Sequence, residues 1–528
     1  MFKSVTKTAV IFSLIFSIVM LCSCSKRGSN LAGNVDLNSY PIKTDIELTM
    51  WMELPTSTSA VCSNFGETQF AQEWAKRTGV KINFVHPASG QESEAFGLMV
   101  ASDSMADIIK YDWTTALGGP STTINDKVIL PLNDLIDKYA PNLKSFLSQR
   151  PDIAKEIVTD NGEYYMFPFI RNDKSLLVSQ GYIIRRDWLN DCGLQMPEVV
   201  EEVEEALIKF RDVKGAKAPM SITKNNIGAL FRLFSATHNF YVDNDVIKYG
   251  PCEPEFRYAL ENLNRWFDEG LLDKNFVSAD QTLVNSNILN GNTGLSYGSG
   301  GGQLGQWLDS AKAAGIELDI TGMPCVAEKK GGLPKFTSAN STVATNGSTA
   351  ISTSCKYPEL AAKVLDYAYS EEGSIFFNFG TEGVSFNWVD GYPKYTDLIM
   401  NNSNLTVAQA MGQHILGHSN GPFIQDKRYI EQYYSKPQQQ EALKNWEIGV
   451  EESASRRLPI LLFTTEEAEE RSSILTEVEK YRDEMIAAFI TGTVSFSDYD
   501  KYLEKLNNLG VKRLIEITQN AYDRYKAR

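Results

Sequence analysis

The sequence predicts an α/β fold with more than one domain. Segments typical of strands and of helices alternate between residues 45 and 113, and a second alternating unit begins at Gly181. The last quarter of the chain has the periodicity of helices. The chain has 528 residues, 43% of them hydrophobic, so it can form two or three domains with large cores.

A signal peptide is predicted at the N-terminus. Lys3 and Lys7 precede an apolar run over residues 9–21, which is shorter than a membrane-spanning helix needs. No later stretch of the sequence is apolar enough to cross a bilayer. We therefore do not expect this chain to be a transporter by itself.

The apolar run ends in Leu-Cys-Ser-Cys at residues 21–24, and this pattern resembles a bacterial lipobox. The resemblance implies that residues 1–23 are a signal peptide and that Cys24 receives a lipid. Residues 24–44 would then be a lipidated tether that holds the rest of the chain on the outside of a membrane. An ordinary signal peptide and a single membrane anchor are the alternatives.

The first α/β unit places aromatic and polar side chains at the ends of its strands. Strands are predicted at residues 45–51, 80–85 and 106–111, and helices at 67–78 and 96–101. This order favours a parallel sheet, in which ligands bind beyond the carboxyl ends of the strands. The residues at those ends are Trp51, Glu53, Tyr111, Asp112 and Trp113.

An extended apolar stretch at residues 164–170 is expected to cross between domains. A second α/β unit starts with residues 181–189, in which Arg185, Asp187 and Trp188 follow a predicted strand. Further strands are predicted at 293–297, 316–320 and 348–352, and further helices at 199–213, 253–269, 307–314, 359–369, 436–450, 466–491 and 496–528, the last interrupted near Gly510.

The net charge of −15 limits the partners that we expect. Proteins that bind nucleic acids need clustered lysine and arginine, so a nucleic-acid partner is not expected. The same charge disfavours an acidic polysaccharide as the only ligand, unless a local basic patch overrides the total.

Five cysteines remain after Cys22 and Cys24. Their number is odd, and no pair has the spacing of a zinc site, so metal binding through them is not expected. One or two disulfides or buried free thiols are both compatible with the sequence. The five are Cys62, Cys192, Cys252, Cys325 and Cys355.

Five stretches together resemble the extracellular solute-binding lipoproteins of carbohydrate ABC importers, the LplA-like group of family 1. Besides the lipobox, they are IIRRDWLNDCGLQMP at 183–197, WFDEGLLDKNF at 266–276, the segment 355–386 and the C-terminal segment 496–525. The last two are fairly specific to this group, and none of the five is a catalytic signature.

The resemblance implies a two-lobed, periplasmic-binding-protein-like fold with a hinge and a helical C-terminal extension. Lobe 1 would comprise residues 45–160 and 335–378, and lobe 2 residues 161–334 and 379–528. The implied protein captures a carbohydrate, expected to be an oligosaccharide, between its lobes and delivers it to the permease subunits of an ABC transporter. It would be a monomer, lipid-anchored at the extracytoplasmic face of the cell membrane, and would not be an enzyme.

A carbohydrate site needs flat apolar rings against the C–H faces of the sugar and planar polar groups for its hydroxyls. The expected ligand-binding residues are Trp51, Glu53, Tyr111, Asp112, Trp113, Arg185, Asp187, Trp188, Trp307, Asn387 and Trp388. The alternative is a core position for each tryptophan and a solvated or ion-paired position for each polar residue. Trp74, Trp266 and Trp446 lie within amphipathic helices, so they are expected in cores.

Three motifs that suggest a cofactor or a metal are incomplete. Residues 300–305 match G-x-G-x-x-G, but we expect a tight glycine loop at the edge of a cleft instead of a dinucleotide site. His414 and His418 lack the glutamate of a zinc hydrolase, and residues 243–245 lack the glycine that a calcium loop needs. A structural calcium ion is therefore unsupported, and no cofactor or metal is expected.

Two other functions stay open. One is an exported glycan-active enzyme, such as a glycoside hydrolase, although no carboxylate pair for it is identifiable in the sequence. The other is a peptide-binding or sensory lipoprotein.

Overall fold

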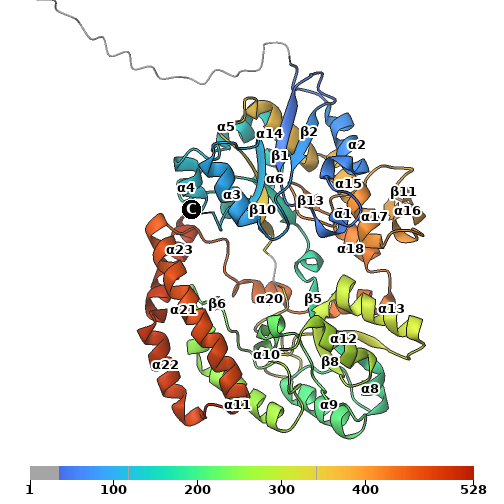
Figure 1. The fold of residues 1–528 in the computed structure, drawn as a ribbon, viewed down its shortest axis with the longest axis vertical. Helices are drawn as coiled ribbons and strands as arrows, with labels where there is room; N and C mark the ends of the chain where they lie inside the picture. The colour runs from blue at the N-terminus through green and yellow to red at the C-terminus, as the bar shows by residue number, and fades with distance from the viewer. Residues whose placement is uncertain (1–34, 117, 340–341) are drawn as a thin grey trace, which may run out of the picture.

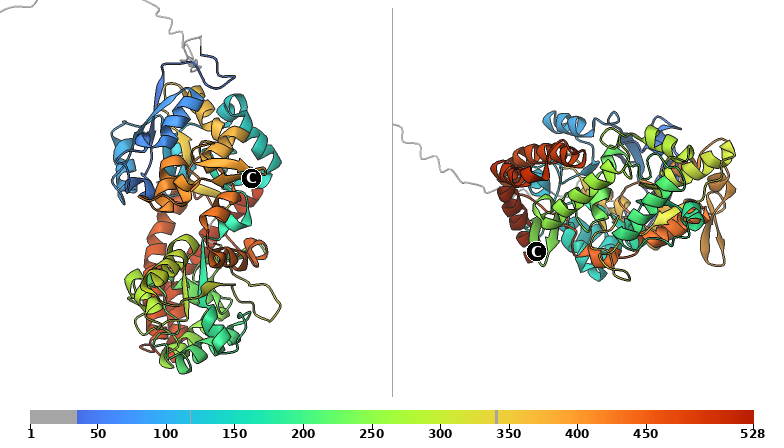
Figure 2. Two further views of the ribbon diagram at one scale, coloured as in Figure 1. Left: turned by 90° about the vertical axis from the view of Figure 1, so that its right-hand side faces the viewer. Right: turned by 90° about the horizontal axis from the view of Figure 1, so that it is seen from below.

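The computed structural model describes residues 35–116, 118–339 and 342–528, so the predicted signal peptide and Cys24 lie outside the described residues. The chain forms two lobes, one above the other in Figure 1, and Figure 2 shows the same division from two further directions. Each lobe has a β-sheet of its own, covered by helices. The predicted α/β class and two-lobed architecture are confirmed.

The upper lobe contains a six-stranded sheet in the order β13-β4-β10-β3-β1-β2. Strands β1, β2 and β3 are parallel, as predicted, but β10 runs antiparallel to both β3 and β4. The carboxyl ends of β1, β2, β3 and β4 therefore meet at one edge of the sheet. The strands are β1 (Glu47–Trp51), β2 (Lys81–Val85), β3 (Ile108–Asp112), β4 (Phe167–Arg171), β10 (Ala344–Ile351) and β13 (Ile424–Gln425).

Helices cover both faces of this sheet. In α2 (Gln69–Thr78), the Thr68 side chain caps the first turn by accepting from the Ala71 amide at 3.1 Å. Gly79, with φ of 77°, ends the helix. Further helices of this lobe are α1 (Thr56–Ser59), α3 (Glu92–Ala101), α4 (Gly119–Asn125), α5 (Asn133–Tyr139), α6 (Pro141–Gln149), α7 (Pro151–Glu156), α14 (Pro358–Asp366), α15 (Glu371–Phe379) and α17 (Val407–His414).

The lower lobe has a three-stranded sheet in the order β8-β5-β9, and its central strand is antiparallel to both neighbours. A separate hairpin is formed by β6 (Phe240–Asp243) and β7 (Val246–Tyr249). The sheet strands are β5 (Gln180–Arg185), β8 (Leu295–Ser299) and β9 (Ile320–Met323), and the main helices are α8 (Arg186–Asp191), α9 (Val200–Asp212), α10 (Gly228–Arg232), α11 (Pro254–Asp268), α12 (Gln281–Leu289), α13 (Gly305–Ala314) and α19 (Pro437–Trp446). Helix α18 (Lys427–Tyr433) follows β13 and lies beside the upper lobe, before the chain reaches α19 (Figure 1).

Two connections between the sheets define the junction of the lobes. Residues 172–179 lead from β4 to β5, and residues 324–343 lead from β9 to β10. Because β4 leaves its sheet toward the lower lobe, the edge with the carboxyl ends of β1 to β4 faces that lobe. The stretch 164–170, expected to cross between domains, includes most of β4 and lies in the upper sheet directly before the crossing.

Three C-terminal helices run along one side of the lower lobe and reach the base of the upper lobe (Figure 1). They are α21 (Thr465–Ile490), α22 (Tyr499–Asn508) and α23 (Val511–Ala527), and Gly510, with φ of 102°, separates the last two near the predicted break. Helix α21 packs against α11 of the lower lobe, whereas Arg524 and Arg528 pair with Asp160 of the upper lobe at 2.9 and 2.7 Å. This helical extension therefore contacts both lobes.

The described residues show the state of the cysteines and the lengths and apolar character of the helices. All five cysteines downstream of the tether are free thiols. None of the helices in the described ranges combines the length and the apolar character that a bilayer span requires.

Candidate functional site

A cavity of about 910 Å³ lies at the junction of the two lobes. We call it the interlobe site. One part of its lining is the loop after β3, which includes Thr114 and Thr115 of the upper lobe. The other part comprises residues 458–461 and Phe463, which precede α21, and residues of the first turns of α21, including Arg471. The interlobe site therefore lies where a ligand would contact both the upper lobe and the C-terminal extension.

The loop after β3 is held in place by Asp112. The Asp112 carboxylate accepts from the Thr114 amide at 3.1 Å and from the Thr114 hydroxyl at 2.7 Å. The Thr115 hydroxyl donates to the Asp112 carbonyl at 2.8 Å. Asp112, an expected ligand-binding residue, thus orients two threonines that line the cavity and is not itself among the lining residues.

Arg471 is the cation in the lining of the interlobe site. Its guanidinium carbon lies 4.7 Å from the centre of the Phe463 ring, so the two planar groups are in cation–π contact. Its Nε is buried and has no hydrogen-bond partner among the residues that the structure describes. Burial lowers the pKa of Arg471, and the negative charge of Glu479 partly opposes this shift.

Two more cations lie on strands of the upper sheet whose carboxyl ends face the lower lobe. Burial lowers the pKa of Lys110 in β3, with an opposing attraction from Glu53, which is itself exposed. Burial also lowers the pKa of Arg171, the last residue of β4, whose guanidinium lies 4.8 Å from the Phe169 ring centre. Glu53, an expected ligand-binding residue, therefore lies near a cation that the sequence did not single out.

Three expected aromatic ligand platforms of the upper lobe are brought together in its core. Trp51, Tyr111 and Trp113 all surround Phe96 of α3, whose ring stacks on Tyr111 at 4.1 Å between centroids. Trp113 is 0% exposed and donates from Nε1 to the Ser348 carbonyl at 3.0 Å. In this structure the three rings pack α3 onto the sheet, and they offer no open face to a sugar.

Arg185, Asp187 and Trp188 lie together, but at the far end of the lower lobe from the upper lobe (Figure 1). Arg185 donates from Nε to Asp187 at 2.8 Å, and its guanidinium lies 4.4 Å from the Trp188 ring centre. The reason for this position is the direction of β5. Since the chain enters β5 from the crossing segment 172–179, the carboxyl end of β5 points away from the junction of the lobes (Figure 1).

The remaining expected tryptophans differ in exposure. Trp307 is buried in the lower lobe and donates from Nε1 to Asn285 at 2.7 Å. Trp388 is 43% exposed and lies with Asn387 on β11 (Phe386–Val389), which forms a hairpin with β12 (Tyr392–Tyr395). The core positions expected for Trp74, Trp266 and Trp446 are confirmed, because all three are nearly inaccessible.

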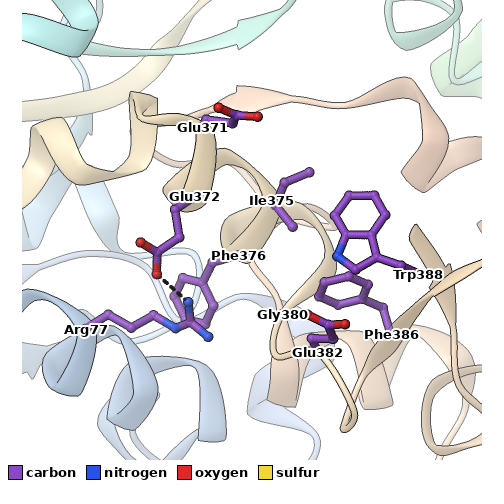
Figure 3. Close-up of a pocket in the computed structure, with 9 residues that line it drawn as sticks. All are labelled: Arg77, Glu371, Glu372, Ile375, Phe376, Gly380, Glu382, Phe386 and Trp388. Carbon is purple, nitrogen blue, oxygen red and sulfur yellow. Dashed lines mark hydrogen bonds and ion pairs between the residues drawn. The ribbon is translucent and has the colours of Figure 1, made fainter. Parts of the chain in front are cut away.

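The Trp388 ring lines a second cavity, of about 380 Å³, on the upper lobe (Figure 3). This hairpin pocket lies between α2, α15 and the β11–β12 hairpin. Arg77 lines the hairpin pocket. Its guanidinium lies 4.6 Å from the Phe376 ring centre and 2.8 Å from the Glu372 carboxylate. The hairpin pocket and the interlobe site share no lining residue, so the structure does not bring Trp388 to the junction.

A line of aromatic side chains that the sequence did not reveal connects the lobes. His418 hydrogen-bonds through Nδ1 to the Tyr429 hydroxyl at 2.9 Å, and its ring centre lies 4.8 Å from that of Tyr433. Tyr433 in turn lies so close to Gly301 that a Cβ there would meet its ring at 2.4 Å. The glycine loop therefore accommodates a tyrosine of the same chain. Sequence periodicity gave no signal for this contact, because its partners are more than 100 residues apart.

The incomplete motifs have structural explanations. The glycine loop follows β8, which is antiparallel to its neighbour, whereas a dinucleotide unit needs parallel strands joined by a helix. Residues 243–245 form the turn of the β6–β7 hairpin, where Asn244 and Asp245 have positive φ and Asp245 pairs with Lys526 at 2.7 Å. Within the described residues, no group of three or more histidine, cysteine, aspartate or glutamate side chains is arranged to hold a metal.

Two α/β lobes with a cavity at their junction define a binding protein of the two-lobed type. The chain belongs to the bacterial extracellular solute-binding protein family, whose model matches residues 66–375. This confirms the resemblance drawn from the sequence motifs.

Two individual proteins are similar in sequence to this chain. The chain is 23% identical to the fructooligosaccharide ABC transporter substrate-binding protein FusA of Streptococcus pneumoniae, over 100% of this chain and 99% of FusA. It is 27% identical to lipoprotein LipO of Bacillus subtilis, over 62% of this chain and 66% of LipO.

Solved structures share the fold. An extracellular solute-binding protein from Bifidobacterium longum subsp. infantis has a TM-score of 0.73 at 18% identity, with 92% of this chain and 99% of that chain covered. FusA in complex with fructo-nystose has a TM-score of 0.71 at 21% identity, with 91% and 100% covered.

Proposed function

We propose that this protein captures an oligosaccharide at the interlobe site and delivers it to the permease subunits of an ABC importer. The observation that carries the proposal is a cavity of about 910 Å³ lined by both the upper lobe and the C-terminal extension. A cavity of this size can hold several sugar rings. The family and the fructooligosaccharide-binding relative support a carbohydrate as the ligand.

Closure of the lobes follows from a ligand that contacts both the upper lobe and the C-terminal extension. A sugar held against Thr114 and Thr115 of the upper lobe and against α21 favours the arrangement in which both surfaces are close. Closure is then a hinge motion about the segments that connect the lobes, among them residues 172–179. No covalent step is needed, since the free energy of binding shifts the lobes toward the closed arrangement.

The proposal also includes a lipid anchor at Cys24 and revised limits for lobe 1. Cleavage before Cys24 and lipidation of its sulfur would anchor a monomer at the extracytoplasmic face of the cell membrane, where the tether raises its effective concentration near the permease. Intact-mass measurement of the membrane-extracted protein tests this. We place the end of the first part of lobe 1 after Arg171 instead of at residue 160, because β4 pairs in the upper sheet. The second part of lobe 1 then extends to Gln425 instead of residue 378, because β13 pairs with β4.

The test of binding is a thermal-unfolding screen with neutral fructo-, malto-, xylo- and galacto-oligosaccharides, followed by calorimetry and analysis of the sugars after incubation. A specific ligand raises the unfolding temperature by mass action. Recovery of that sugar unchanged supports a binding protein. Shortened products would instead show an enzyme, and stabilisation by peptides but by no sugar would overturn the proposal.

A further inference from the structure

We infer that the interlobe site selects an oligosaccharide that carries a carboxylate, and that Arg471 recognises this group. The inference rests on the proposed function, because it names the class of oligosaccharide held at the same site. A cation in the lining of the interlobe site contrasts with the negative charge of the whole chain. The whole chain carries a net charge of −15, yet the interlobe site is lined by a cation, Arg471, for which no hydrogen bond to a carboxylate is found among the described residues. Two further cations, Lys110 and Arg171, lie on β3 and β4, the strands whose carboxyl ends face the lower lobe.

Arg471 is positioned to bind an acceptor from a ligand. It lines the cavity, and Phe463 supports one face of its guanidinium at 4.7 Å. Buried side-chain donors almost always have partners, yet Nε of Arg471 has none among the described residues. Glu479, the carboxylate whose charge acts on Arg471, lies two helical turns further along α21 and makes no ion pair with it. No hydrogen bond or ion pair of the terminal N–H groups of Arg471 is found among the described residues either, so these groups can bind an acceptor in the cavity.

A carboxylate fits these donors better than sugar hydroxyls do. The guanidinium presents its N–H groups in a planar fork, which matches the two oxygens of a carboxylate. The stack on Phe463 limits rotation of this plane, so less freedom is lost when the pair forms. Burial also disfavours the charged form of Arg471, and an anionic ligand compensates for this while a neutral hydroxyl compensates less.

Lys110 and Arg171 add positive potential at the same junction. Both lie on strands whose carboxyl ends face the lower lobe, and burial weakens their screening by water. Glu469 is the carboxylate in the lining of the interlobe site, and it is exposed, so its repulsion is better screened. Exposed Glu53 offsets part of the charge of Lys110. Burial lowers the pKa of Arg171, and no ion pair of Arg171 with a carboxylate is found among the described residues.

The experiment compares sugars that differ only in the carboxyl groups. Binding of trigalacturonate and of its carboxyl-reduced form, galactotriose, is measured by calorimetry with the full mature protein, and the pairs from trimannuronate and triglucuronate are tested in the same way. We expect at least one acidic trimer to bind about tenfold to a hundredfold more tightly than its reduced form, because a hydrogen bond to a charged group contributes more than a neutral one. Higher salt concentration should reduce this preference.

Variants assign the preference to Arg471. Arg471→Gln should remove it by weakening the binding of the acidic trimer far more than that of the reduced trimer, whereas Arg471→Lys should keep part of it as a point charge without the fork. Glu469→Gln is the matched control from the same cavity and should keep or increase the preference. Equal unfolding temperatures of the variants exclude a folding defect.

The contrary outcomes separate this inference from the proposed function. If neutral oligosaccharides bind as tightly as every acidic trimer, or if Arg471→Gln leaves the preference intact, acidic selectivity by Arg471 is wrong and the proposed function stands. If no acidic or neutral oligosaccharide binds the protein, both are wrong.

Discussion

Replacement of Trp188 by alanine distinguishes a core role from a ligand-binding role for this residue. Sequence reasoning expects Trp188 in a sugar site, so the change should reduce affinity without unfolding the protein. The structure leads to the opposite expectation. Trp188 is only 6% exposed, its ring meets Phe210 at 5.3 Å between centroids, and the Arg185 guanidinium covers it at 4.4 Å.

The size of the effect follows from this packing. Removing a buried tryptophan ring leaves a cavity between α8 and α9, and such changes lower the free energy of unfolding by about 3–5 kcal/mol. With a urea dependence of about 2–3 kcal/mol per molar, the midpoint of unfolding should fall by about 1–2.5 M. The affinity for the best oligosaccharide of the screen should stay the same, because α8 lies at the far end of the lower lobe (Figure 1).

The assay is urea unfolding followed by circular dichroism, together with calorimetry on the folded variant. Trp188→Phe is the control, because it keeps a ring against Phe210 and should lose roughly half as much stability. An unchanged midpoint combined with lost affinity would refute the structural reasoning and return Trp188 to the ligand site.

Three further changes test other parts of the structure. Gly181→Ala should lower the free energy of unfolding by about 1–3 kcal/mol, since its Cβ would meet the Trp446 ring at 2.4 Å; an unchanged urea midpoint would contradict this packing. Asp160→Asn should lower stability by about 1 kcal/mol and speed hydrogen exchange in α23, because it removes the partner of two arginines; unchanged exchange would show that the pair does not hold the extension. Burial lowers the pKa of both His238 and His418 to about 4, so each imidazole stays neutral in the folded state. The free energy of unfolding should therefore be highest above pH 6.5 and should fall as the pH drops toward 4. A urea midpoint that rises as the pH is lowered over this range would contradict this expectation.

Much of the local structure could be predicted from the sequence. Alternating apolar residues located the first three strands, and the break at Gly510 separated the last two helices. These features depend on spacing within a few residues, so they can be read without knowing the fold. The motifs at 183–197 and 355–386 similarly pointed to the family that the comparison shows.

The position of the site residues depended on the tertiary structure. Trp113 and Trp188 both follow a strand. Trp113 packs against Phe96 of α3, whereas Trp188 follows β5, whose carboxyl end points away from the junction. The end of a strand that faces the other lobe depends on where the chain crosses between the lobes, and the partners that hold β5 in its sheet lie more than 100 residues away in the sequence. A local pattern therefore identifies a strand end without showing which edge of the molecule it reaches.

Local spacing and short motifs were enough to predict the α/β class, the helical extension and the family of the chain. The surroundings of the interlobe site, in contrast, depend on long-range packing. Arg471 and Phe463 reach the loop after β3 because α21 returns to the upper lobe some 350 residues later in the chain. Long-range packing creates this neighbourhood, and no periodicity in the sequence records it.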